Sequence, residues 1–130
     1  MVRPQELLRF TTDHKTLDAV LADQELASLG DAYVNLLYSL YLSMKTRSPT
    51  GGKVDNLTLS KALIHSGLRG KIASRSDRHK QADAAEALLV FAWLQGVTTI
   101  MECLGIMLKQ KSSVRALGSL LAHAYKKLNL

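Results

Sequence analysis

Residues 24–44 read QELASLGDAYVNLLYSLYLSM, and this stretch decides the fold class. Its apolar side chains recur at steps of three and four residues, as they do along one face of an α-helix. The positions that form this stripe are Leu26, Leu29, Tyr33, Leu36, Leu37 and Leu40. We therefore expect one long helix over residues 24–44, with a continuous apolar stripe facing a core.

The remaining segments also favour helices over strands. Proline occurs only at Pro4 and Pro49, and no segment keeps up the period-two alternation typical of a strand. Gly67 and Gly96 are placed to end helices. We expect further helices over about residues 14–22 (capped by Thr12 or Asp13), 56–65, 76–95, 97–109 and 113–127. The predicted fold class is all-α, a helical bundle formed by a single domain over residues 1–130.

The composition describes a folded chain with room for a core. Hydrophobic residues make up 47% of the 130 residues and charged residues 22%, a balance that excludes a disordered chain. No apolar run is long enough to span a membrane, and the first residues carry polar and charged side chains rather than a signal peptide. We expect a soluble, cytoplasmic protein without membrane contact.

The charge and the single cysteine narrow the function classes. The formal net charge of +6 favours a polyanionic partner, of which nucleic acid is the commonest, although many basic proteins bind none. Cys103 alone excludes an internal disulfide and a cysteine-rich zinc site, and its apolar neighbours indicate a buried, inert thiol. His14, His65, His79 and His123 show no metal-ligand spacing, and we expect ordinary surface or packing residues there.

Asp31 stands in the middle of the apolar stretch of residues 29–36. A buried, unpaired carboxylate is costly, so Asp31 must be protonated, paired, partly solvated or bound to a cation. Gly30 beside it weakens a helix by about 1 kcal/mol relative to alanine, which indicates that another element packs closely there. The alternative is a helix residue that simply reaches solvent or a lysine.

A second acidic pair stands in the stretch ADAAEA at residues 82–87. Asp83 and Glu86 are three residues apart and share one face of the predicted helix. Two carboxylates on one face repel each other unless a cation lies between them, and a hard ion such as Mg²⁺ often takes only one or two such ligands. The alternative is a solvated face near a helix N-terminus, where the helix dipole favours acids.

Together the two acidic segments resemble ribonuclease III. That family carries a signature close to Glu-Phe-Leu-Gly-Asp-Ala-Val on one helix and Ala-Asp-x-x-Glu-Ala-x-x-Gly-Ala on a later one. Here the stretches read ASLGDAY at residues 27–33 and ADAAEALL at residues 82–89, in the same order, with a basic segment before the second. The resemblance covers roughly residues 20–105. Archaeal ribonuclease III-like proteins and Mini-ribonuclease III look most similar, because they too lack a separate double-stranded-RNA-binding domain.

The resemblance implies the helical fold of the ribonuclease III endonuclease domain and Mg²⁺-dependent hydrolysis of double-stranded or structured RNA. It implies Asp31 and Glu86 as the catalytic residues and main metal ligands, Asp83 as a supporting ligand, and Mn²⁺ as a substitute for Mg²⁺. The bound ion would activate a water in line with a phosphate, and a second ion arriving with the substrate would stabilise the leaving 3′ oxygen. The family acts as a homodimer with two equivalent sites along one basic valley.

Three positions depart from the family pattern. The first acidic residue of the signature is Ala27 here, and Glu25 cannot replace it because two residues turn a helix by about 200°. Mini-ribonuclease III also tends to have a small residue at that position. Ser28 replaces the bulky aromatic residue that helps to lock the dimer of bacterial enzymes, and Val90-Phe91 replaces the Gly-Ala of the second motif.

Cations crowd the segment before the second acidic motif, with only Asp77 opposing them. This placement predicts contact with an RNA backbone as it passes the metal site. The alternative is a solvated basic loop. The expected RNA-binding residues are Arg69, Lys71, Arg75, Arg78 and Lys80.

Three functions remain open on these residues. The first is a Mg²⁺-dependent endoribonuclease. The second is a ribonuclease III-like RNA-binding protein that has lost cleavage, which Ala27 supports. The third is a helical interaction module in which the acidic pairs are incidental. The first depends on two distant helices bringing Asp31 within a shared ion's reach of Asp83 and Glu86.

Overall fold

The computed structural model describes Leu8, residues 13–71 and residues 77–130. Within these parts of the chain the helices are α2 (Leu17–Leu21), α3 (Gln24–Thr46), α4 (Asn56–His65), α5 (Arg78–Leu94), α6 (Ile100–Leu108) and α7 (Ser113–Leu128), with a 3-10 helix, η1 (Arg69–Lys71). The described residues contain no strand, which confirms the predicted all-α class. None of the helices described is long and apolar enough to cross a membrane.

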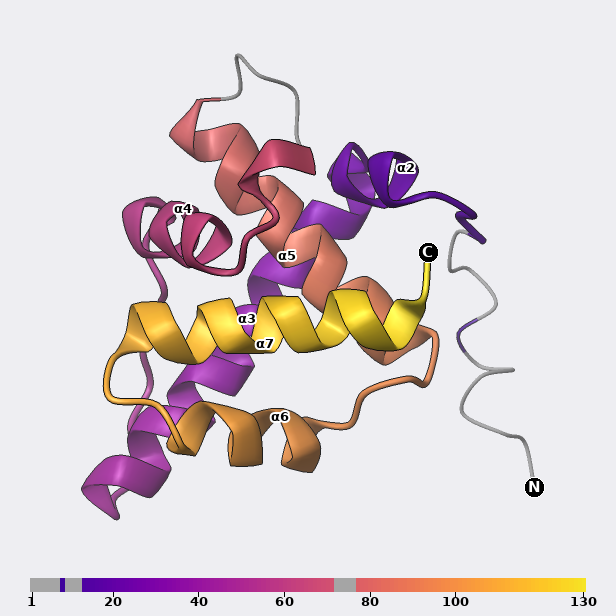
Figure 1. Ribbon diagram of the computed structural model, residues 1–130. Helices are drawn as coiled ribbons and strands as arrows, with labels where there is room; N and C mark the ends of the chain where they lie inside the picture. The colour runs from indigo at the N-terminus through magenta and orange to yellow at the C-terminus, as the bar shows by residue number, and fades with distance from the viewer. Residues whose placement is uncertain (1–7, 9–12, 72–76) are drawn as a thin grey trace, which may run out of the picture.

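Helix α5 is the centre of the fold. Every residue from Ala84 to Ala92 is buried, because α2, α3, α4 and α7 all pack against this helix. Between Ala84 and Ala92 this helix therefore has no solvated face of the kind found on amphipathic helices. Figure 1 shows α3 and α5 crossing, with α7 laid across the front of the view. Glu86 therefore lies within the longest continuous buried run of the described chain.

Side-chain caps decide where the helices begin. An oxygen of the residue before each helix accepts a hydrogen bond from a backbone N–H of its first turn. The caps of α3, α4, α5 and α7 are Asp23, Asp55, Asp77 and Ser112. Thr16 caps α2, and Thr99 caps α6, where Glu102 completes a capping box. These last two caps correct the predictions: the first and fifth expected helices begin later, at Leu17 and Ile100.

The C-terminal ends of the helices lie closer to the predicted residues than their beginnings do. Helix α3 extends to Thr46, two residues beyond the predicted end, and Arg47 then takes a left-handed conformation with φ of 57°. Gly67 and Gly96 have φ of 84° and 77° just after α4 and α5, as expected for helix-ending glycines. Lys80, one of the predicted RNA-binding residues, lies in the first turn of α5, inside the helix predicted over about residues 76–95.

Candidate active site

The crossing of α3 and α5 is closer than any side chain at Gly30 would allow. A Cβ atom at this position would lie 2.2 Å from the Glu86 carbonyl oxygen and 3.0 Å from the Glu86 Cβ. Only glycine permits this approach, because helix backbones cannot interpenetrate. The close packing predicted beside Asp31 is confirmed, and the element that packs there is the α5 turn of Glu86.

The three predicted acids line one pocket at this crossing. Asp31 comes from α3, whereas Asp83 and Glu86 come from α5. The pocket has a volume of about 310 Å³, and its other lining residues are Gln24, Ala27, Ser28 and Asn56. Two helices that are distant in the sequence therefore bring their carboxyl groups to one surface depression.

Glu86 is the acid of this pocket whose pKa is clearly shifted. Its side chain is buried, with 6% of the residue exposed, and burial is the largest cause that raises its pKa. A hydrogen bond with the Asp31 side chain and the charges of Asp31 and Asp83 act in the same direction, and together these causes raise the pKa of Glu86 from 4.5 to about 8. At pH 7 the Glu86 carboxyl therefore keeps its proton. No Lys, Arg or His of the described chain forms an ion pair with these three acids.

Asp31 occupies the exposed rim of the pocket rather than the core. The sequence allowed Asp31 to be protonated, paired, partly solvated or bound to a cation. In the structure it is solvated, and Asn35 Nδ2 donates a hydrogen bond to Asp31 Oδ1 at 3.2 Å. The buried acid is Glu86 instead. Asn35 was not among the predicted site residues, although its place four residues after Asp31 on one helix face is a signal for such a bond.

The described residues of the pocket offer carboxyl donors to a metal ion rather than a complete metal site. In the residues that the structure describes, no three His, Cys, Asp or Glu side chains converge closely enough to form a ready-made metal site. The donor set nevertheless suits a hard cation, because three acidic side chains line the pocket and none of its described lining residues is a Lys, Arg or His. Mg²⁺ commonly binds through one or two carboxylates and keeps several waters, so two of these acids are sufficient ligands.

Two of the three departures from the family pattern lie at this pocket. Ala27, at the position of the first acidic residue, is 4% exposed and lines the pocket wall. Ser28 is exposed and lines the pocket beside it. Glu25 is exposed and is not one of the lining residues, in agreement with its predicted direction. Val90 and Phe91 are buried in the core.

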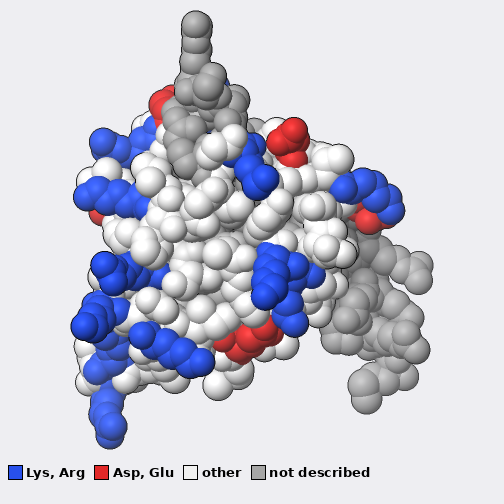
Figure 2. Space-filling view, viewed as in Figure 1, with Lys and Arg blue, Asp and Glu red and all other residues white. Residues whose placement is uncertain are grey.

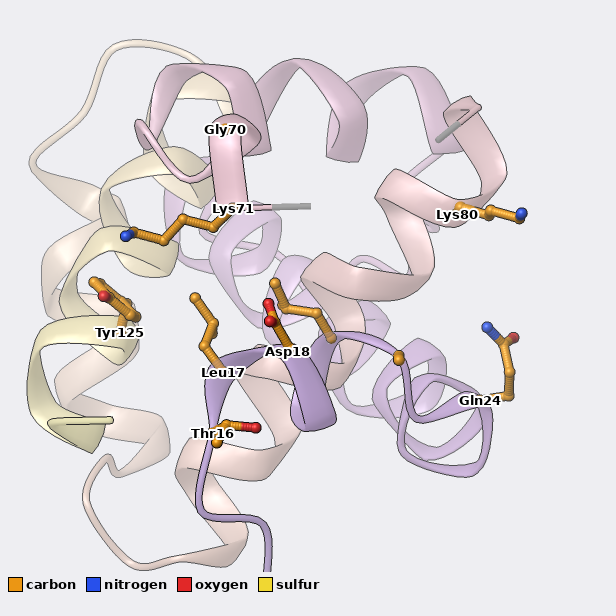
Figure 3. Close-up of a pocket in the computed structure, with 10 residues that line it drawn as sticks. Thr16, Leu17, Asp18, Gln24, Gly70, Lys71, Lys80 and Tyr125 are labelled. Carbon is orange, nitrogen blue, oxygen red and sulfur yellow. The ribbon is translucent and has the colours of Figure 1, made fainter. Parts of the chain in front are cut away.

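Two of the predicted RNA-binding lysines line a second, larger pocket of about 850 Å³. Figure 3 shows Lys71 beside Tyr125 at one end and Lys80 near Gln24 at the other. The Lys71 Nζ lies 5.6 Å from the centre of the Tyr125 ring, a cation–π distance. Because Gln24 lines both pockets, the basic pocket and the acidic pocket adjoin at the start of α3.

The other basic candidates are described only in part. Arg78 is exposed in the first turn of α5, next to the cap of that helix. Arg69 belongs to η1, but its side chain lies outside the described residues, and so does all of Arg75. Figure 2 shows further Lys and Arg side chains along the edge where α3 ends and α6 connects to α7. The sequence places Lys45, Arg47, Lys109 and Lys111 in these segments.

Three of the four histidines form hydrogen bonds with other parts of the chain. His79 Nδ1 pairs with Asn56 Nδ2 at 2.7 Å, beside the acidic pocket. His14 Nε2 lies 2.8 Å from an Asp23 carboxylate oxygen, and His123 Nε2 lies 2.6 Å from a Glu102 carboxylate oxygen. These bonds give the histidines structural roles in joining elements.

The lone thiol lies deep in the fold. Cys103 is buried, as predicted, with its Sγ 3.9 Å from the Tyr33 hydroxyl oxygen. Burial raises the pKa of Cys103, so the reactive thiolate is disfavoured.

The comparison with protein families identifies the domain. A family model described as ribonuclease III matches residues 24–128, which include both acidic motifs and every helix from α3 to α7. A search of curated proteins found no match to the chain. The family match covers far more than half of the sequence and agrees with the motif order, the all-α fold and the shared acidic pocket. The chain therefore belongs to the ribonuclease III family, and this membership suggests an RNA-cleaving function.

Proposed function

We propose that this protein is a Mg²⁺-dependent endoribonuclease that hydrolyses phosphodiester bonds in double-stranded or structured RNA. One observation carries the proposal: in a ribonuclease III domain, Asp31, Asp83 and Glu86 line a single pocket, where burial and the two neighbouring aspartates raise the pKa of Glu86 to about 8. Uncompensated carboxylates in a solvent-accessible pocket are the arrangement that a divalent cation relieves.

The acids of the pocket would have different roles in metal binding. Asp31 and Glu86 would hold the ion, Mn²⁺ would substitute for Mg²⁺, and Asp83 would add negative charge beside them. When bound, Mg²⁺ supplies an activated water and neutralises charge at the phosphate. Glu86 must lose its proton before it can act as a ligand, so we expect metal binding to release protons near neutral pH.

The adjoining basic pocket supports a path for the RNA backbone. Lys80 and Lys71 would contact phosphates on the side of Gln24 away from the acids. Arg69, Arg75 and Arg78 belong to the same proposed surface by their position in the sequence. A-form RNA is read largely through phosphates and 2′-hydroxyls, so we expect binding that depends strongly on salt and little on base sequence.

We further propose that the protein works as a homodimer in the cytoplasm and is most closely related to Mini-ribonuclease III and archaeal ribonuclease III-like proteins. The support for a dimer is apolar surface on the helix that carries Asp31. Leu29 is 40% exposed and Leu36 is 48% exposed on α3, and Met101 on α6 is 71% exposed. Ser28 is also exposed, so the aromatic contact known in bacterial enzymes would have to be replaced by other residues.

One observation favours a second candidate, a ribonuclease III-like protein that binds RNA without cutting it. Ala27 lines the pocket where the family pattern has an acid, so one carboxylate is missing from the wall. The two candidates differ in the outcome of a single assay.

Cleavage of a structured RNA in Mg²⁺ tests the proposal. We expect products with 5′-phosphates, no cleavage in EDTA, and loss of cleavage but not of binding in Glu86→Gln. Binding by the parent chain without any cutting in Mg²⁺ or Mn²⁺ would favour the second candidate. If the chain shows no salt-sensitive RNA binding at all, it is a helical interaction module.

A further inference from the structure

Asn35 is hydrogen-bonded to one acid of the acidic pocket and to the segment that precedes α4, without lining the pocket itself. It lies on α3, one helical turn after Asp31, and is half-buried. Its Nδ2 donates to Asp31 Oδ1 at 3.2 Å, and its Oδ1 accepts from the backbone N–H of Val54 at 2.9 Å. One amide therefore joins the exposed acid to a segment 19 residues further along the chain.

The two bonds fix the direction of the amide. A backbone N–H can only donate, so the amide oxygen of Asn35 must face Val54. The amide nitrogen then faces Asp31, where it meets a carboxylate oxygen that can only accept while the acid is ionised. A flipped amide would lose both bonds, so the side chain has one satisfactory orientation.

The anchored segment leads directly to Asn56, a lining residue of the pocket. Val54 is buried and directly precedes Asp55, the cap of α4. Asn56, the first residue of α4, lines the acidic pocket. The Asn35–Val54 bond therefore helps to decide where α4 begins and where Asn56 stands relative to Asp31.

We infer that Asn35 is a positioning residue of this site. It holds the Asp31 carboxylate at a fixed position relative to Asn56, another lining residue of the pocket. The inference rests on the proposed function, because it assigns Asp31 a role as a metal ligand. A hydrogen bond to a ligating carboxylate restricts its orientation, and loss of such a partner typically weakens metal binding by about 10- to 100-fold.

Ser39 provides a matched control on the same helix. Its hydroxyl donates to the Gly52 carbonyl oxygen at 3.0 Å and accepts from the Gly52 N–H at 2.9 Å, so it anchors the same connecting segment one turn further on. It has no bond to Asp31 and does not line the pocket. Ser39→Ala therefore loosens the segment without touching the acid.

The test measures Mn²⁺ affinity by electron paramagnetic resonance without RNA, together with the rate of RNA cleavage. Asn35→Leu keeps the approximate volume and removes both bonds. Asn35→Ser is a second variant, because its hydroxyl is too short to bridge Asp31 and Val54. Circular dichroism and thermal unfolding identify which variants are folded, and the folded ones are compared with Ser39→Ala.

We expect Mn²⁺ affinity to fall about tenfold or more in the folded Asn35 variants, with cleavage falling in parallel, and to stay within about twofold in Ser39→Ala. Equal losses in the Asn35 and Ser39 variants, or no loss in either, would overturn the positioning role while leaving the proposed function intact. Failure of the parent chain to bind Mn²⁺ would overturn the proposed function and this inference with it.

Discussion

Replacing Glu86 with glutamine should stabilise the metal-free protein at alkaline pH and end catalysis at the same time. The parent side chain is buried beside Asp31 and Asp83, and its pKa is raised from 4.5 to about 8. Glutamine has nearly the same shape and can still donate a hydrogen bond to Asp31, but it never becomes charged. The change therefore removes the ionisation of Glu86 and keeps its packing.

The magnitude follows from the difference between the folded and unfolded pKa values. Below pH 4.5 Glu86 is protonated in both states and has no pH-dependent effect. As pH rises towards 8, the unfolded chain loses this proton and the folded chain retains it, so the free energy of unfolding falls. At about 1.4 kcal/mol per pH unit, the loss between pH 5 and pH 8.5 is roughly 4 kcal/mol, a large share of a typical stability of about 5–15 kcal/mol.

Urea unfolding in EDTA at several pH values from 5 to 8.5 measures this effect. The two proteins share every other titratable group, so the difference between parent and variant isolates Glu86. We expect the two stabilities to be nearly equal at pH 5 and the variant to be more stable by several kcal/mol at pH 8.5. Mg²⁺ should narrow the gap at pH 8.5 by stabilising the parent alone.

If the free energies of unfolding of the parent and of Glu86→Gln change in parallel across this pH range, the predicted pKa shift is wrong. Glu86 would then ionise as freely in the folded state as in the unfolded state. A parent that is more stable than the variant at pH 8.5 in EDTA would refute it more strongly. It would indicate that a cationic partner already neutralises the pocket.

Three further predictions concern the crossing, the RNA path and the dimer. Gly30→Ala should lower the free energy of unfolding in urea by roughly 1–3 kcal/mol and weaken Mn²⁺ binding, because the new Cβ would strike the α5 backbone. The control Gly105→Ala, with nothing within 4 Å of the new Cβ, should be neutral or stabilising. Equal effects of the two substitutions would contradict close packing at Gly30. Lys80→Ala should weaken binding to double-stranded RNA and lower the slope of log affinity against log salt by about 1; an unchanged slope would exclude this lysine from the backbone path. Leu36→Glu should shift a dimer to monomer in sedimentation velocity, whereas Ile64→Glu, on α4 and 56% exposed, should not; a dimer that survives Leu36→Glu would place the interface elsewhere.

Local patterns in the sequence were enough to predict that these helices exist and to single out the three acids. Apolar spacing at three and four residues predicted α3, because that spacing reflects helix geometry alone. Gly30 could be recognised as a place of close approach, since glycine inside a helix is unfavourable without a packing reason. The order of the two motifs was enough to indicate the family, and the matched residues 24–128 agree with it. All of these are local properties of the chain.

Which acid of the pocket is buried and which is exposed depends on tertiary packing. Asp31 lies in an apolar stretch, yet it is exposed, and the buried acid with the raised pKa is Glu86. The first and fifth helices also begin later than predicted, where Thr16 and Thr99 bond to their first turns. The bond from Asn35 to Val54 and the entry of Asn56 into the pocket depend on segments that are distant in the sequence. Burial and electrostatic coupling depend on which elements meet in space, and no local pattern records that.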